Sequence, residues 1–227
     1  DLANRGHFHA VLADRLAEPE PSAALLLVDI DGFNEINDVF GHEEGDAALI
    51  QVGELLRTLA GDGELVARLG GDEFALLLNG DAGVALTRAE AVAARFVAPI
   101  EKPGRSHRLG ASIGVALAPL DGATPEALLK SADLALYAAK ARGHGQIARF
   151  EAEIGEAFAR RKAIEAALET GTFVAGLSLV FQPQVELATG RLVGVEALMR
   201  YIDPTLGAIR PDAFVAVAEQ TGHIAAL

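Results

Sequence analysis

Four acidic residues stand at two places in the chain where their side chains could do chemistry. Asp29 and Asp31 end a short apolar run, and Asp72 and Glu73 follow a pair of glycines. Converging carboxylates in a chain without cysteine favour a hard cation with oxygen ligands, Mg²⁺ before any softer metal. The glycine backbone leaves room for a phosphate to approach. Together these residues indicate metal-assisted phosphoryl or nucleotidyl transfer.

Each of these features also has an ordinary structural explanation. A Gly-Gly pair followed by two acids is most often a solvated hairpin turn. Acids at the end of a strand commonly cap the helix that follows, and Asn37 with Asp38 could simply start a turn. Taken singly, the residues leave both the structural and the chemical explanation open.

The composition limits the classes of protein. With 51% hydrophobic and 22% charged residues, the chain is expected to bury a core. A formal net charge of -13 argues against nucleic-acid binding through a broad basic face, and it means that a phosphorylated ligand needs local compensation. The apolar run at residues 23–28 is far shorter than the ~20 residues that span a bilayer. We expect a cytoplasmic chain without membrane contact.

Hydrophobic periodicity predicts the elements that position these acids. Apolar residues at helical spacing indicate helices over residues 3–17, 46–59, 84–97 and 125–142. Short apolar runs indicate strands over residues 23–30, 64–69, 73–79, 109–118 and 146–150. Gly70 and Gly71 join two of these strands as a hairpin. This order is typical of an α+β fold, a ferredoxin-like mixed sheet flanked by helices.

The chain changes in character beyond residue 150. Residues 151–169 are rich in Ala, Glu, Arg and Lys, which predicts a semi-rigid helical connector. Strand-like segments follow at residues 177–185 and 192–199. We therefore expect a first domain over residues 1–150, a linker helix over residues 151–173 and part of a further domain over residues 174–227.

A series of short motifs follows in a fixed order along residues 4–140. They read NR (residues 4–5), VDIDGF (28–33), IND (36–38), GH (41–42), GD (45–46), RLGGDEF (68–74), SIGVA (112–116), and AD, LY and K within residues 132–140. This series resembles the signatures of GGDEF domains, the diguanylate cyclase family, whose fold is of the palm type, and the namesake motif is intact. The first motif begins partway through the family's opening signature, so an upstream sensory or dimerising domain is expected.

This resemblance implies a reaction and a metal site. The family joins two GTP molecules into cyclic di-GMP, a bacterial second messenger, as the 3'-hydroxyl of one attacks the α-phosphate of the other and pyrophosphate leaves. Asp29 and Asp72 would bind Mg²⁺ or Mn²⁺ through their carboxylates, and Ile30 through its carbonyl. Glu73 would lie beside the reacting sugar and phosphate. Since one domain holds one GTP, turnover implies a homodimer.

The resemblance also implies how GTP is held. An amide and a carboxylate, from Asn37 and Asp46, would pair with the guanine edge. Backbone amides would cradle the terminal phosphates, and Lys140 would meet them as a point charge. The residues implied for GTP binding are Gly32, Phe33, Asn34, Asn37, Asp46, Gly70, Gly71 and Lys140.

Four positions depart from the family pattern. Asn34 stands where many relatives carry Lys, and His144 stands where an Arg that contacts phosphate is expected. An Arg-to-His change removes a permanent charge and a bidentate donor. Gly61 and Glu64 occupy the positions of the family's Arg-x-x-Asp product site, so feedback inhibition through that site is not expected.

A second, shorter series reads FQP (residues 181–183), TG (189–190), EALMR (196–200), AE (218–219) and TG (221–222). It resembles the start of EAL domains, which hydrolyse cyclic di-GMP on a barrel. The resemblance implies Glu196 as a metal ligand, with Gln182 and Arg200 near the substrate. Only about fifty residues lie in this region, against roughly 250 for a barrel. No phosphodiesterase activity is therefore expected of this chain, and Glu196 could equally be a lone acid on an incomplete sheet.

Three functions remain in competition. The favoured hypothesis is a diguanylate cyclase. The alternative is a catalytically weak GTP-binding domain that regulates a downstream EAL phosphodiesterase. A scaffold that does not bind GTP is disfavoured because the residues implied to meet metal and guanine are intact.

Overall fold

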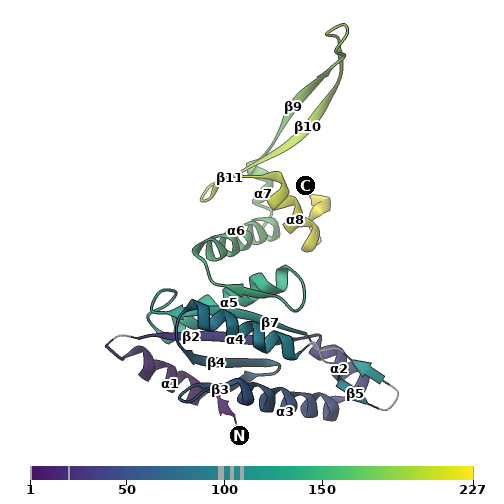
Figure 1. Ribbon diagram of the computed structural model, residues 1–227. Coiled ribbons are helices and arrows are strands. Elements are labelled where there is room, and N and C mark those ends of the chain that lie inside the picture. The colour runs from purple at the N-terminus through teal and green to yellow at the C-terminus, as the bar shows by residue number, and fades with distance from the viewer. Residues whose placement is uncertain (1, 20, 97–99, 103–104, 108–109, 227) are drawn as a thin grey trace. The chain divides into compact units, whose positions relative to one another are not determined.

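The computed structural model describes residues 2–226 except residues 20, 97–99, 103–104 and 108–109 (Figure 1). The chain divides into two compact units, Asp1–Gly155 and Glu156–Leu227, and each is described by itself. Among the described residues, no helix is long and apolar enough to cross a membrane.

The first unit is built on one mixed sheet of six strands within the described residues. The central strand β2 pairs antiparallel with β4 on one side and with β7 on the other. Every residue of β2 is buried, because both edges are hydrogen-bonded and both faces are covered. The strand order is β1 (Ala3–Asn4), β3 (Leu65–Gly70), β4 (Glu73–Asn79), β2 (Ala23–Asp31), β7 (Gly110–Ala118) and β8 (Ile147–Arg149).

Helices cover both faces of this sheet. On one face, Leu26, Val28 and Ile30 pack with α2 (Phe33–Phe40), α3 (His42–Leu59) and α4 (Ala82–Arg95). On the other face, Leu25 and Leu27 pack with α1 (Arg5–Leu16) and α5 (Pro125–Ala141). Successive side chains of a strand alternate between faces. The next odd-numbered residues, the two aspartates that end β2, therefore project on the face covered by α1 and α5.

Helix starts follow from local capping. Asn4 accepts a hydrogen bond from the backbone N–H of His7 at 2.9 Å, which caps α1. Thr124 caps α5 in the same way, and proline follows it at the first helical position. These side chains satisfy backbone donors that have no partner inside the helix.

Gly114, in the middle of β7, lets α5 lie directly on the sheet. A Cβ at this position would lie 2.2 Å from the backbone oxygen of Ala132 and 2.4 Å from the backbone nitrogen of Leu136. Both contacts are with helix backbone, which cannot move aside cheaply. The glycine of the SIGVA motif thus has a packing role, and the position of α5 depends on it.

The predicted fold class, a mixed sheet flanked by helices, is confirmed. The strands over residues 23–30 and 73–79 were placed to within one residue. Helix α2 was not expected, because Asn37 and Asp38 favour a turn; buried Phe33 and Ile36 hold it as a helix instead. The short strands β5 (Ile100–Lys102) and β6 (Arg105–His107) were also not expected.

Two predicted boundaries, the helix end at residue 97 and the strand start at residue 109, lie outside the described residues.

The second unit contains most of helix α6 (Ala152–Glu169), which covers the segment predicted to be helical; its role as a connector stays a prediction. Figure 1 shows β9 and β10 as a long hairpin. Its base packs on a cluster in which the rings of Phe173 and Tyr201 stack with centroids 3.7 Å apart. The remaining elements are α7 (Phe173–Gly176), β9 (Leu177–Val185), β10 (Leu192–Asp203), β11 (Gly207–Ile209), α8 (Pro211–Gln220) and η1 (Ile224–Ala226).

A buried carboxylate organises the turn between β10 and β11. Asp203 accepts backbone hydrogen bonds from Thr205 and Leu206, both at 2.8 Å, and one from the Tyr201 hydroxyl at 2.9 Å. These donors lower the pKa of Asp203 from its ordinary value of 3.8, with the Leu206 amide contributing most. Burial, reinforced by Asp203, raises the pKa of Tyr201 to about 12.

Replacing Gly114 with Ala should destabilise the first unit strongly, by about 3 kcal/mol, because α5 must shift off β7. Urea denaturation followed by circular dichroism measures this change. Gly6→Ala is the matched control: its Cβ would meet only the Asn4 side chain at 3.5 Å, and alanine favours the helix. Equal stability of the Gly114 variant and wild type would contradict the packing role.

Replacing Asp203 with Ala should destabilise the second unit by about 1–3 kcal/mol at pH 7, because the buried Tyr201 hydroxyl and two backbone N–H groups of the turn lose their acceptor. A lowered pKa stabilises the fold above 3.8 and loses that effect as the pH falls. The deficit should therefore shrink below pH 4. Hydrogen exchange of the Thr205 and Leu206 amides measures it, with the exposed Asp212→Ala as control; a pH-independent deficit would contradict this account.

Candidate functional site

The end of β2 brings a buried carboxylate against a cation from α5. Asp29 is 7% exposed, and its Oδ2 lies 2.7 Å from Nζ of Lys140 in the last turn of the helix. In register, Asp29 lies opposite Glu73 on β4 and Ser112 on β7. Residues from three neighbouring strands and one helix thus meet at this point.

Burial raises the pKa of Asp29 above its ordinary value of 3.8, since water no longer solvates the charge. Lys140 opposes this effect through its hydrogen bond and charge, whereas Asp72 and Asp31 raise the pKa further by repulsion. The backbone N–H of Ile30 donates to the carbonyl of Asp72 at 3.3 Å. The acids of the hairpin and of β2 are therefore electrostatic neighbours, as expected.

The turn between β3 and β4 is held by its own arginine. Gly70 and Gly71 have φ of 153° and 52°, which side chains rarely adopt. Arg68 donates from both Nε and Nη2 to the carbonyl of Gly71, at 2.9 and 2.8 Å. This bidentate contact fixes the loop that carries Asp72.

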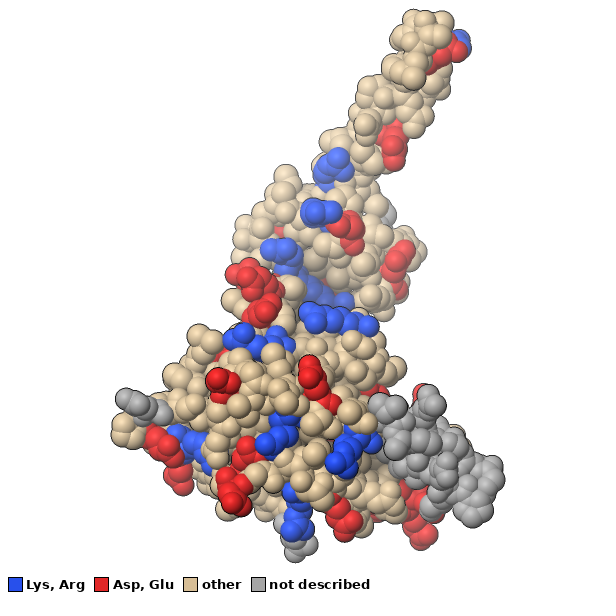
Figure 2. Space-filling view, viewed as in Figure 1, with Lys and Arg blue, Asp and Glu red and all other residues tan. Residues whose placement is uncertain are grey.

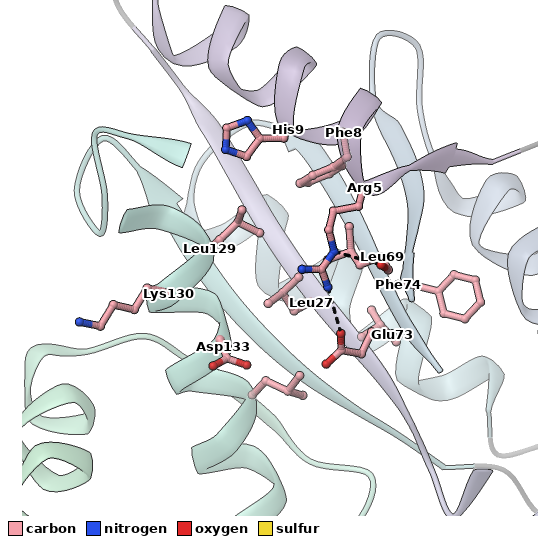
Figure 3. A pocket seen from close by; sticks show the side chains of 12 residues that line it. Arg5, Phe8, His9, Leu27, Leu69, Glu73, Phe74, Leu129, Lys130 and Asp133 are labelled. Atoms are coloured by element: carbon pink, nitrogen blue, oxygen red, sulfur yellow. Dashed lines mark hydrogen bonds and ion pairs between the residues drawn. The ribbon is translucent and has the colours of Figure 1, made fainter. Parts of the chain in front are cut away.

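Glu73 faces a cavity of about 370 Å³ between α1, α5 and the sheet (Figure 3). Its carboxylate lies 3.8 Å from Nη2 of Arg5, whose Nε donates to the carbonyl of Leu69 at 3.1 Å. In Figure 3, Lys130 and Asp133 stand on α5, across the cavity from this pair. Glu73 is thus held towards α1 rather than towards Asp29.

The residues present suit a metal that completes its coordination with phosphate oxygens. Among the described residues, no three His, Asp or Glu side chains gather closely enough to hold an ion alone. Asp29 and Asp72 nevertheless offer two neighbouring carboxylates, one of them buried and with a raised pKa. Mg²⁺ is commonly bound by one or two carboxylates plus substrate phosphates. This donor set fits Mg²⁺ or Mn²⁺ bound together with a nucleotide.

Helix α2 presents an uncapped N-terminus directly after β2. Its N-cap, Gly32, has φ 73° and makes no side-chain capping bond. The amides of Phe33 and Asn34 therefore lie in a first turn without a side-chain cap, the usual arrangement for binding an anion. The residues expected to cradle phosphates thus follow directly in sequence after the strand that ends with Asp29 and Asp31.

Helices α2 and α3 meet where the guanine edge was expected. Only Gly41, with φ 88°, separates them. A Cβ at Gly45 would lie 2.0 Å from Oδ1 of Asn37 and 3.2 Å from the ring of Phe33. The side chain of Asn37 therefore lies over Gly45, next in sequence to the exposed Asp46.

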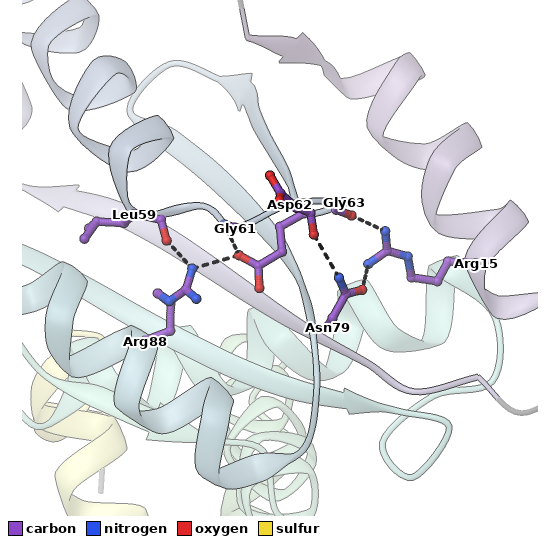
Figure 4. Close-up of polar contacts among 8 residues, drawn as sticks. Arg15, Leu59, Gly61, Asp62, Gly63, Asn79 and Arg88 are labelled. Atoms are coloured by element: carbon purple, nitrogen blue, oxygen red, sulfur yellow. Dashed lines mark hydrogen bonds and ion pairs between the residues drawn. The ribbon is translucent and has the colours of Figure 1, made fainter.

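The segment at residues 61–64, where a product site would lie in other family members, is occupied by internal contacts (Figure 4). Glu64 accepts from the amide of Gly61 at 2.6 Å and from Nη1 of Arg88 at 2.7 Å. Arg15 reaches the same segment from α1, donating to the carbonyl of Gly63 at 2.5 Å and to Asn79 at 2.7 Å. Glu64 thus has structural partners of its own.

The EAL-type residues lie on the β9–β10 hairpin. Gln182 and Glu196 are directly opposite each other in the antiparallel register, so their side chains share one face. Arg200 lies further along β10 on that face and donates to the carbonyl of Met199 at 2.8 Å. All three are exposed.

Figure 2 shows acidic and basic side chains interspersed over the visible face of the first unit, without a broad basic surface there.

Two contacts at the site were not foreseen. Arg68 and Ser112 stand inside the quoted motifs, but their partners, Gly71 and Asp31, follow from the folded geometry. Ser112 lies 81 positions from Asp31 in sequence, so the sequence pattern gives no sign of the pairing.

Comparison with known proteins agrees with this geometry. Residues 1–146 match the family model described as diguanylate cyclase, GGDEF domain, and residues 161–227 match the EAL domain. The chain is 38% identical over 202 residues to the bifunctional diguanylate cyclase/cyclic di-GMP phosphodiesterase MucR of Pseudomonas aeruginosa, covering 88% of this chain but only 30% of MucR.

Solved structures show the same domain. The GGDEF domain of YfiN from Pseudomonas aeruginosa has a TM-score of 0.63 at 39% identity, covering 66% of this chain and 98% of that one. The GGDEF domain of DgcB from Caulobacter crescentus, in complex with c-di-GMP, has a TM-score of 0.62 at 28% identity, covering 65% and 91%. The resemblance drawn from the motifs is confirmed, and this chain belongs to the GGDEF domain family of diguanylate cyclases, with an EAL-family segment at residues 161–227.

Proposed function

We propose that the first unit is a diguanylate cyclase that condenses two GTP molecules into cyclic di-GMP and pyrophosphate. The observation that carries this proposal is the juxtaposition, around the end of β2, of Asp29, Asp72 and Lys140 with the uncapped N-terminus of α2. Carboxylates for a metal and donors for phosphates are the two requirements of nucleotidyl transfer.

Separate groups of residues would bind the terminal phosphates and the metal ion. The amides at the start of α2 would donate to the terminal phosphates, and Lys140 would exchange its contact with Asp29 for one with phosphate. Asp29, Asp72 and the carbonyl of Ile30 would hold Mg²⁺ or Mn²⁺, which when bound supplies charge neutralisation at the α-phosphate.

The same proposal assigns roles at the reacting sugar and the base. Glu73 lies opposite Asp29 in register and would lie beside the attacking 3'-hydroxyl, which comes from a GTP held by a second copy. A homodimer with two-fold symmetry is then required. Asn37, held over Gly45, and Asp46 would pair with the guanine edge.

One observation favours the alternative, a GTP-binding domain that turns over slowly and regulates an EAL phosphodiesterase in a longer GGDEF-EAL signalling protein. His144, at the position of an expected phosphate-contacting Arg, lies 3.2 Å from the Asp31 carboxylate. Asn34 replaces a further cation. Both differences weaken the compensation of triphosphate charge.

The first prediction is turnover itself. Purified protein at high concentration, with GTP and Mg²⁺ or Mn²⁺, should yield cyclic di-GMP and pyrophosphate, resolved by chromatography. Asp72→Asn should lower the rate by about 100-fold or more, as expected when a group that stabilises developing charge is lost. GTP binding without any product at concentrations where the dimer forms would reject the cyclase and support the regulatory alternative.

A second prediction follows from the raised pKa of Asp29. A raised pKa means that the ionised carboxylate is less stable in the folded protein, so stability falls as the pH rises above 3.8. Asp29→Asn should therefore melt at a higher temperature than wild type at pH 7 without nucleotide, and should lose GTP turnover.

Calorimetry and the turnover assay measure the two effects of Asp29→Asn. Asp14→Ala, which removes an exposed acid on α1, is the charge control. A lower melting temperature for Asp29→Asn would show that its pairing with Lys140 outweighs the desolvation of the carboxylate.

A further inference from the structure

Asp31 is a buried carboxylate to which the proposed reaction gives no role. Its side chain is 5% exposed. Its Oδ1 accepts from the Ser112 hydroxyl at 2.7 Å and lies 3.2 Å from Nδ1 of His144. Its Oδ2 accepts from the backbone N–H of Gly145 at 2.7 Å. The carboxylate thus has donors on both oxygens, and among the described residues these donors include no lysine or arginine.

These contacts join elements that are distant in sequence. Asp31 ends β2, Ser112 lies on β7, and His144 with Gly145 lies in the segment between α5 and β8. A Cβ at Gly110, the cross-strand partner of Asp31, would lie 2.8 Å from Oδ2. The absence of a side chain there leaves the space that the carboxylate fills.

The segment after α5 depends on such an anchor. Gly143 and Gly145 have φ of 121° and 70°, and glycine loses more conformational freedom on ordering than any other residue. The side chain of His144 is 84% exposed, so little packing holds it. Hydrogen bonds to an ionised, buried acceptor are about twice as strong as neutral ones. The contacts with Asp31 therefore supply much of what orders this segment.

Asp29 and Asp31 hold the two ends of one short stretch. Both project on the α5 face of β2, where Asp29 contacts Lys140 and Asp31 contacts Gly145. Between these anchors, α5 ends and the chain turns back towards β8. The first residues after β2 are the uncapped turn of α2. The stretch is therefore fixed beside the turn proposed to receive phosphates.

We infer that Asp31 is a positioning residue that clamps residues 143–145 onto β2, so that the cationic end of α5 is held at the triphosphate subsite. This inference rests on the proposed binding of GTP. It concerns placement of the phosphate donors, because the hydrogen bonds that Asp31 accepts come from Ser112 and from Gly145 in the segment after α5.

Nucleotide affinity tests the inference. The probes are α,β-methylene GTP, in which the bond that would break is a P–C bond, and GMP, which lacks the terminal phosphates. Asp31→Ala should weaken binding of the triphosphate by about tenfold and leave GMP affinity within about twofold. The dissociation constant of the triphosphate divided by that of GMP should therefore rise. Asp31→Asn, which keeps one acceptor oxygen in place of two, should lose about threefold.

The exposed Asp14→Ala supplies the matched loss of charge and should leave the ratio unchanged. Equal loss of triphosphate and GMP affinity, or an unchanged ratio, would overturn the inference. If Asp31→Ala does not fold, Asp31→Asn decides alone, and a wild-type ratio in that variant overturns it.

Hydrogen exchange without nucleotide separates the clamp from the proposed function. The amide of Gly145 should exchange at least about tenfold faster in Asp31→Ala than in wild type, whereas amides in β4 should not change. Slow exchange of Gly145 in the variant would overturn the clamp. Failure of wild type to bind the triphosphate would instead reject the proposed function and, with it, the phosphate role of Asp31.

Discussion

The burial of two carboxylates at the end of the central strand is the constraint on which the rest of the first unit depends. β2 is paired on both edges and covered on both faces, so neither acid has free access to water. A buried charge is costly unless it is paired or hydrogen-bonded. Lys140 meets Asp29, and Ser112 with Gly145 meets Asp31. The compensating groups come from β7, from α5 and from the segment that follows α5. Their contacts with the two aspartates hold these elements against β2.

Close packing makes that compensation possible. Gly114 allows the backbone of α5 to contact β7, and the lysine in the last turn of α5 then reaches the end of β2. On the opposite face, α2 and α3 are joined through one glycine and bring Asn37 over Gly45. The site therefore has two halves, built by different contacts on the two faces of the sheet. The absence of a side chain at Gly114 and at Gly45 allows the close contacts in both halves.

Much of this could be predicted from the sequence. The buried strands are recognisable as short apolar runs, and the ordered motifs identify the family. Helix α2 could not be predicted, since Asn37 and Asp38 favour a turn and only the burial of Phe33 and Ile36 holds the helix. The pairing of Asp31 with Ser112 spans 81 positions, so no local pattern encodes it. The sequence therefore did not reveal the long-range contacts or helix α2, whereas it did indicate the main strands of the sheet.

The division of the site into two halves bears on how such a domain evolves. Contacts of Asn37 with Gly45 do not involve the acids of β2, so the half proposed to bind guanine would not depend on the charges proposed to support catalysis. If these proposed roles hold, cations that contact phosphate could be lost while the guanine nucleotide is still bound. A lineage could pass in this way from making a messenger to sensing its precursor without passing through an unfolded or ligand-free ancestor.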